Sequence, residues 1–280
     1  MHLFRPMRQA GVSLNRIENS IMKTQLKKSL SALLLGGALA AAAAHAAPPP
    51  QDLKGKNIVL VHGAFADGSS WNKVIPLLEA HGAHVVAVQN PLTSLADDAA
   101  AARRVIDAQQ GPVILVGHSW GGSVITEAGN DDKVKALVYV AALAPDNGQS
   151  VNDLMRGAPA PAWAPELRKD SGGFLTLSTN GILHQFAQDL PAASARVLAA
   201  TQGPWAASAL DDKVSKAAWH NKPSAFVVTD LDHMIDPAAQ ARMAAAIGAT
   251  VTHVRSSHVA MLSHPAAVAA AIIAEAKKVD

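Results

Sequence analysis

The sequence of 280 residues contains no cysteine. This absence excludes disulfide bonds, cysteine-ligated metal sites and thiol catalysis, but it does not indicate a redox compartment. The sequence also lacks an internal repeat with a period of roughly 20 to 50 residues, which argues against a solenoid or a propeller. The length of the chain suits one domain, or one domain carrying an insertion. Because 49% of the residues are hydrophobic, the chain can form a large core.

The N-terminal 46 residues have the composition of an export signal. A basic segment begins at Met22, an apolar run covers residues 30–44, and Ala44-His45-Ala46 forms an A-x-A cleavage signal. The apolar run is too short for a comfortable transmembrane span, although an uncleaved anchor is the alternative. We therefore predict that residues 1–46 are an N-terminal extension and signal peptide, with Met22 as the true start. The processed protein is then periplasmic or secreted and is not bound to a membrane.

The excess of positive charge belongs to this leader. Residues 1–46 hold six Lys or Arg and one Glu, so their removal changes the formal net charge from +2 to −3. No basic patch remains to favour nucleic acid or an acidic lipid surface as a partner. The expected partner is a small molecule, and the sequence indicates no oligomeric state.

Residues 47–280 alternate short apolar runs with helical segments. Strands are expected over residues 57–62, 84–88, 112–116, 134–141, 224–229 and 250–254. Helices are expected over residues 69–81, 97–109, 123–129, 237–248 and 265–278. Continuous apolar runs are typical of parallel strands covered on both faces, which predicts an α/β fold. Residues 145–222 show no clear strand and are expected to form a small helical cap at the carboxyl ends of the strands, where such sheets bind ligands.

One motif in this pattern indicates chemistry. Gly117-His118-Ser119-Trp120-Gly121 fits G-x-S-x-G, and it lies between an expected strand and an expected helix. A sharp turn there holds the serine hydroxyl at a helix N-terminus, where the helix dipole favours developing negative charge. A Gly-rich turn with Ser119 as an ordinary helix cap is the alternative. We predict that Ser119 is a nucleophile.

A serine hydroxyl needs a base to remove its proton. Of the 12 histidines, His258 follows the last expected strand and precedes the last helix, on the sheet edge that carries the Ser119 turn. His253 lies within the strand and His264 abuts Pro265, so both are expected to be structural or solvated. We predict that His258 is the general base.

The acid that orients the histidine should follow the strand that ends near Thr229. Asp230, Asp232 and Asp236 all lie there. Asp236 precedes a proline and resembles a helix cap. Position alone favours Asp232 only slightly over Asp230.

The oxyanion of an acyl transfer needs two N–H donors. The main-chain amides of Trp120, directly after the nucleophile, and Ala64, in the loop after the first strand, are the candidates. The same loop could be mistaken for a phosphate loop, but it lacks the lysine and the glycine spacing of one. No metal or organic cofactor is expected.

These motifs resemble the α/β-hydrolase superfamily. More narrowly, they resemble the branch with plant methylesterases, hydroxynitrile lyases and small bacterial esterases. The similarity spans roughly residues 55–280 and lies in the oxyanion loop, the serine turn, the acid loop and the histidine loop, at residues 61–71, 115–122, 229–235 and 257–265. In that branch the second aspartate of the acid loop belongs to the triad, so the resemblance selects Asp232 and implies the α/β-hydrolase fold.

The departures from the branch favour ester hydrolysis. Its lyases carry a threonine after the first-strand histidine and a lysine after the catalytic histidine, and here those positions are Gly63 and Val259. Dehalogenases and epoxide hydrolases of this fold use an aspartate where this chain has Ser119. The resemblance therefore implies a serine esterase that cleaves a small to medium ester through an acyl-enzyme.

Apolar side chains around the serine are expected to form the walls for the substrate. The candidates are Phe65 and the cap residues Leu175, Leu183, Phe186 and Trp205. Two alternatives to an esterase stay open, namely a receptor-like protein that binds a ligand with little turnover and a lyase of the hydroxynitrile type.

Overall fold

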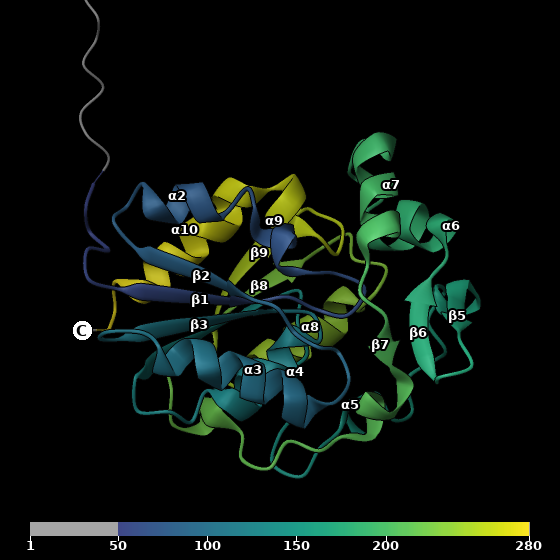
Figure 1. Ribbon diagram of the computed structural model, residues 1–280, viewed down its shortest axis with the longest axis horizontal. Coiled ribbons are helices and arrows are strands. Elements are labelled where there is room, and N and C mark those ends of the chain that lie inside the picture. The colour runs from purple at the N-terminus through teal and green to yellow at the C-terminus, as the bar shows by residue number, and fades with distance from the viewer. Residues whose placement is uncertain (1–49, 280) are drawn as a thin grey trace, which may run out of the picture. The chain divides into compact units, whose positions relative to one another are not determined.

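A parallel β-sheet forms the centre of the protein (Figure 1). The computed structural model describes residues 50–279, so the leader predicted over residues 1–46 lies outside the described residues. The sheet has six strands in the order β2-β1-β3-β4-β8-β9. The strands are β1 (Asn57–Val61), β2 (His84–Val88), β3 (Val113–His118), β4 (Val134–Val140), β8 (Ser224–Thr229) and β9 (Thr250–Val254). All five neighbouring pairs are parallel, which confirms the α/β class.

Helices cover both faces of the sheet, and this explains why β1 and β3 are buried along their whole length. One face carries α2 (Ile75–Glu79) and α10 (Pro265–Ala276), and the other carries α3 (Leu95–Asp107) and α4 (Gly121–Ala128) (Figure 1). The helix α8 (Pro237–Ala246) packs against β8, and the short α9 (Ala260–Ser263) precedes α10. Among residues 50–279, no helix has the length and apolar character needed to cross a bilayer.

The helix expected over residues 69–81 is divided in two. A 3-10 turn, η1 (Gly68–Trp71), comes first and is capped by Asp67, whose carboxylate accepts from the Ser69 N–H. The α2 helix then begins with Pro76 in its first turn. A proline has no N–H for the preceding turn and favours a helix start, which accounts for the break.

The segment between β4 and β8 lies at the carboxyl ends of the strands (Figure 1). Its helical elements are α5 (Val151–Leu154), η2 (Ala164–Glu166), α6 (Thr179–Gly181), η3 (Ile182–Phe186), α7 (Ala192–Thr201), η4 (Ala207–Asp211) and η5 (Ala218–His220). The prediction that this cap has no strand is wrong. It contains an antiparallel sheet of β5 (Leu167–Lys169), β6 (Phe174–Leu177) and β7 (Trp205–Ala206). These strands are three, four and two residues long, too short to show a period of two in the sequence.

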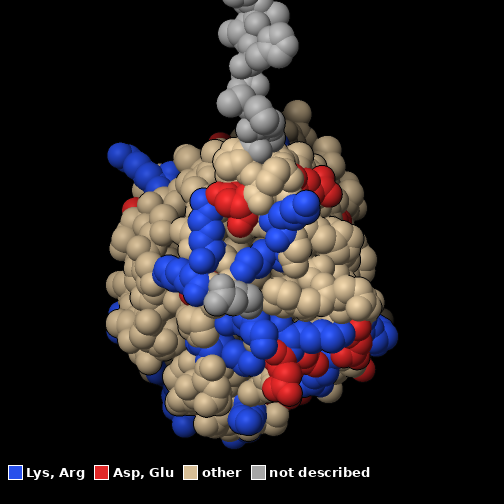
Figure 2. All heavy atoms as spheres, turned by 90° about the vertical axis from the view of Figure 1, so that its left-hand side faces the viewer, with Lys and Arg blue, Asp and Glu red and all other residues tan. Residues whose placement is uncertain are grey.

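Contrary to the expectation from the net charge of residues 47–280, Lys and Arg side chains gather on the face formed by the amino ends of the strands, with a few Asp and Glu among them (Figure 2). In a parallel α/β layer the helices run opposite to the strands, so their negative carbonyl ends lie at this face. Lys133 donates to the carbonyls of Asp107 and Gln109 at the end of α3, at 2.6 and 3.0 Å. Lys56 donates to the carbonyl of Val279, just after α10. Several of these cations therefore stabilise the ends of helices.

Candidate active site

Ser119 occupies the sharp turn between β3 and α4. Its φ is 54°, in the left-handed region that non-glycine residues rarely adopt. The main chain is held there on both sides, because the Ser119 N–H donates to Val140 O at 3.2 Å and the Ser119 carbonyl accepts from Gly122 N at 2.9 Å and Leu143 N at 3.1 Å. Strain of this kind persists only where the surroundings enforce it, and it is concentrated at functional sites.

Glycines beside Ser119 let three chain segments approach one another. A Cβ atom on Gly117 would lie 2.4 Å from the carbonyl oxygen of Gly121. A Cβ on Gly122 would lie 2.2 Å from the carbonyl oxygen of Leu143. Both distances are far inside van der Waals contact with main-chain atoms, which cannot rotate away as a side chain can.

We expect Gly122→Ala to destabilise the fold by about 3 kcal/mol or more, because the added methyl must displace the main chain of the turn. Denaturant unfolding measures the loss. The control is Gly172→Ala in an exposed cap turn, where the nearest atom to the new Cβ is a movable carboxylate oxygen of Asp170 at 3.3 Å. Equal stability of the two variants would contradict the close packing described for this turn.

His258 and Asp232 form a buried pair. The Nδ1 atom of His258 lies 2.8 Å from Oδ2 of Asp232, and the two side chains are 1% and 0% exposed. Four other groups donate to Asp232. Thr229 Oγ1 and Gln240 Nε2 both donate to Oδ2 at 2.8 Å. The main-chain N–H groups of Met234 and Ile235 donate to Oδ1 at 2.7 and 3.1 Å. This set of donors fixes the Asp232 carboxylate in the orientation that faces Nδ1 of His258.

Asp230, the other candidate acid, lies elsewhere. Its Oδ1 atom contacts Nδ1 of His253 at 2.8 Å, and both side chains are largely exposed. The loop after β8 therefore directs one aspartate to the surface and the other to His258. Asp236 caps α8, as its position before Pro237 predicts, by accepting from the Ala239 N–H.

Ser119 and His258 line one cavity of about 90 Å³. Its other lining residues are Ala64, Phe65, Trp120, Leu143, Val151, Met155, Trp163, Phe186, Trp205, Leu210, Met234 and Ile235. Within residues 50–279 the Ser119 hydroxyl forms no hydrogen bond. Ser119 and His258 are related instead by lining the same cavity. The walls are apolar, and His258 is the one titratable side chain among them.

Of the predicted wall residues, Phe65, Phe186 and Trp205 line the cavity, and Leu175 and Leu183 do not. Leu183 shares the π-helical turn η3 with Phe186 but packs against the hydrophobic core instead. Positions i and i+3 share a face in an α-helix, but the wider π turn, which bonds the Ala187 N–H to the Ile182 carbonyl, rotates them apart. The seven lining residues that the sequence did not indicate come from five separate segments, so no local pattern unites them.

Ala64 and Trp120, the two candidate oxyanion donors, both line the cavity. Their main-chain N–H groups donate no hydrogen bond within residues 50–279. Phe65, next to Ala64, has a φ of 59°, a second strained position at the site. The loop that carries Ala64 abuts Ser119, since a Cβ on Gly63 would lie 2.6 Å from Cβ of Ser119.

Two further buried histidines, His118 and His62, contact the main chain of loops around the site. Nε2 of His118 lies 3.0 Å from the carbonyl oxygen of His258, and burial lowers the pKa of His118 well below its usual value. His62 accepts from the Asn90 N–H through Nε2 at 2.9 Å, and its Nδ1 atom lies 2.9 Å from the Gly63 carbonyl. Burial lowers the pKa of His62 as well. Both rings thus connect neighbouring loops through main-chain contacts, a structural role that the sequence analysis did not assign.

The cap also holds the histidine loop. Asp189 accepts from the Ser257 N–H at 2.8 Å, from the Ser257 hydroxyl at 2.5 Å and from the Ser256 hydroxyl at 3.1 Å. The Phe186 ring meets the His258 ring edge-on, with centroids 5.2 Å apart. Nothing in the sequence near Asp189 signals this contact, because its partners lie 67 and 68 positions away.

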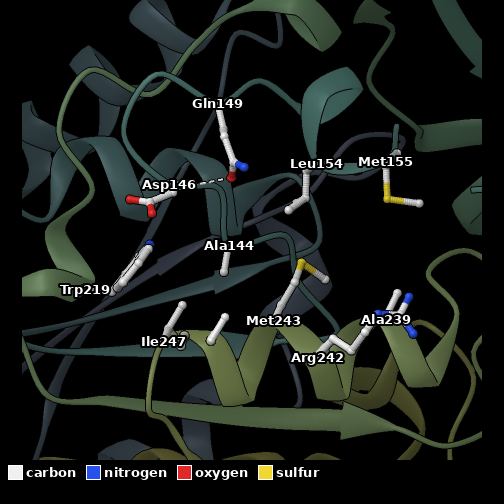
Figure 3. Close-up of a pocket in the computed structure, with 11 residues that line it drawn as sticks. Ala144, Asp146, Gln149, Leu154, Met155, Trp219, Ala239, Arg242, Met243 and Ile247 are labelled. Carbon is white, nitrogen blue, oxygen red and sulfur yellow. Dashed lines mark hydrogen bonds between the residues drawn. The ribbon is translucent and has the colours of Figure 1, made fainter. Parts of the chain in front are cut away.

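Other hollows lie outside this cavity. One of about 340 Å³ contains none of Ser119, Asp232 or His258, and Asp146 and Trp219 face Arg242 and Met243 of α8 across it (Figure 3). Asp146 is already engaged, because His220 lies 2.7 Å from its carboxylate. A groove of about 740 Å³ shares Met155 and Met234 with the catalytic cavity, so these two side chains lie between the cavity and the outside. Within residues 50–279 no three His, Asp or Glu side chains are arranged to hold a metal ion.

A strained serine after a parallel strand, with a buried His–Asp pair at the same sheet edge, defines the class of α/β hydrolases. The comparison with protein families agrees, since the model of the alpha/beta hydrolase family matches residues 58–271. The chain belongs to this family.

Named relatives include esterases and a binding protein. The chain is 37% identical over 109 residues to salicylic acid-binding protein 2 of Nicotiana tabacum, covering 34% of this chain and 42% of that protein. It is 33% identical over 102 residues to a pyrethroid hydrolase of Sphingobium wenxiniae, covering 31% of this chain and 36% of the relative. The chain thus matches less than half the length of these two relatives. The solved structure of polyneuridine aldehyde esterase has the same fold, with a TM-score of 0.69 at 21% identity over 78% of this chain and 98% of that one.

Proposed function

We propose that this protein is a serine hydrolase that cleaves small to medium carboxylic esters through an acyl-enzyme. The observation that carries the proposal is the strained Ser119 facing the same apolar cavity as the buried His258–Asp232 pair. The esterase names among the relatives support the same class of reaction.

In the proposed mechanism, His258 removes the Ser119 proton through Nε2 while Oγ attacks the ester carbonyl. Asp232 holds the opposite nitrogen and stabilises the imidazolium that forms. The free amides of Ala64 and Trp120 donate to the oxyanion of the tetrahedral intermediate. His258 then protonates the leaving alcohol, and a water activated by the same ring cleaves the acyl-enzyme.

The cavity favours a neutral substrate with apolar or aromatic groups. Its walls hold three tryptophans and two phenylalanines and no Lys or Arg that could neutralise a substrate anion. Its volume of about 90 Å³ suits a small group next to the scissile bond. A bulkier part of the ester would extend past Met155 and Met234 into the outer groove. We also propose that the protein acts in the periplasm or outside the cell, because the sequence of residues 1–46 predicts a signal peptide.

The test is the release of p-nitrophenol from its acetate and butyrate esters by the purified protein. We expect many equivalents of product per protein molecule. Release of a single equivalent would instead indicate a ligand-binding protein that is acylated once, the alternative that the tobacco relative's name suggests. Release of cyanide from a cyanohydrin without ester turnover would indicate a lyase.

A further inference from the structure

Asp98 of α3 is a buried carboxylate beside the proposed site. It is 0% exposed, and no Lys or Arg of residues 50–279 pairs with it. Desolvation raises its pKa to about 6, against the lowering effect of its two hydrogen bonds. A buried carboxylate without a cation destabilises a fold, so its presence calls for a role.

Both hydrogen bonds lead to the wall of the catalytic cavity. One carboxylate oxygen accepts from the indole N–H of Trp120 at 2.7 Å, and the other accepts from the main-chain N–H of Leu92 at 2.7 Å. Trp120 follows the nucleophile, and its ring centroid lies 5.1 Å from that of Trp205. Trp205 in turn meets Phe65 of the oxyanion loop edge-on at 6.0 Å. These three rings form one continuous aromatic wall.

The hydrogen bond from Leu92 to Asp98 also connects Asp98 to this aromatic wall. Leu92 has a φ of 60°, so its backbone is held in an unfavourable conformation. Its carbonyl oxygen accepts from the Ala206 N–H at 2.8 Å, which ties the β7 strand of the cap to this loop. Trp205 is the neighbour of Ala206 in that strand. Asp98 thus holds one ring of the wall directly and the segment that carries the next ring through Leu92.

We propose that Asp98 is a positioning residue that keeps the Trp120 indole against Trp205 and so keeps the catalytic cavity narrow. The inference rests on the proposed ester hydrolysis. A narrow cavity favours short acyl groups, and loosening the Trp120 ring admits longer ones. Asparagine at position 98 has the same shape but presents an NH₂ group to one of the two N–H donors, so one hydrogen bond must be lost.

The test compares kcat/KM for p-nitrophenyl acetate and hexanoate in the parent, Asp98→Asn, Trp120→Phe and the double variant. Loss of one buried hydrogen bond is worth about a tenfold effect. We expect the acetate-to-hexanoate ratio to fall roughly tenfold in Asp98→Asn. Trp120→Phe removes the indole N–H and should lower the ratio in the same direction. The effect of the double variant should be smaller than the sum of the two single effects, because Trp120→Phe already removes the indole N–H that Asp98 holds.

The matched control is Asp97→Asn, the same chemical change one residue earlier on α3. Asp97 is exposed and bonds to Thr93 and Ser94 at the start of the helix, so its ratio should equal that of the parent. A purely structural role for Asp98 would lower kcat/KM for both esters in equal proportion and leave the ratio unchanged, which would overturn the inference. Fully additive effects of the two single substitutions on the ratio would also overturn it.

Fluorophosphonates with short and long alkyl chains provide the same comparison without ester turnover, because they react with an activated serine. Reaction with Ser119 at an unchanged short-to-long ratio in Asp98→Asn overturns this inference alone. Failure of the parent both to hydrolyse the esters and to react with either reagent overturns the proposed function, and this inference with it.

Discussion

Replacing Ser119 with alanine is expected to lower kcat for ester hydrolysis on the order of 10⁶-fold, because the nucleophile of a triad cannot be replaced by its neighbours. The fold should survive, since within residues 50–279 every hydrogen bond of Ser119 is made by its main chain. We therefore expect Ser119→Ala to remove activity without lowering the free energy of unfolding. Steady-state rates and an unfolding curve for the same preparation measure the two quantities.

Ser123 provides the matched control for this substitution. It lies on α4 next to the same turn, is buried, and has a hydroxyl without a hydrogen-bond partner in the described part of the chain. Ser123→Ala removes the same atom and should leave kcat within about twofold of the parent, since Ser123 does not line the cavity and so makes no transition-state contact. If Ser119→Ala keeps the parent's rate, the covalent mechanism proposed above is wrong.

Asp232→Asn is expected to reduce kcat by about 10⁴-fold. An asparagine that turns its NH₂ group toward Nδ1 of His258 stabilises the tautomer with the proton on Nε2, and that nitrogen can then no longer accept the Ser119 proton. The alternative orientation keeps the tautomer but opposes the NH₂ group to the N–H groups of Met234 and Ile235. Either way a buried donor loses its acceptor, so the free energy of unfolding should also fall by about 1–3 kcal/mol.

The control for this prediction is Asp230→Asn, two residues earlier in the same loop. Its carboxylate contacts the exposed His253, and exposed pairs of this kind contribute about 0–1 kcal/mol. We expect little change in activity or stability. A large loss of kcat at Asp230 together with a small one at Asp232 would show that the wrong aspartate has been assigned to the histidine.

Much of the sheet could be predicted from the sequence because the signals are local. A strand buried on both faces must be a continuous apolar run, and β1 and β3 are such runs. The turn around Ser119 needs glycine at positions where no Cβ fits, so the spacing of the glycines in the sequence indicates the turn. The order of the motifs then places the three loops at one edge, because the carboxyl ends of parallel strands all point the same way.

The contacts that complete the site were decided by the tertiary structure. Position in the sequence barely distinguishes Asp230 from Asp232, whereas in the fold one is exposed and the other meets His258. The strands of the cap, the contact of Asp189 with Ser257 and the contact of Asp98 with Trp120 have no signal in the sequence. The cap strands are too short to show a period, whereas the Asp189 and Asp98 contacts join segments well separated along the chain. The energy of such a contact depends on distance and burial in space, which periodicity along the chain does not encode.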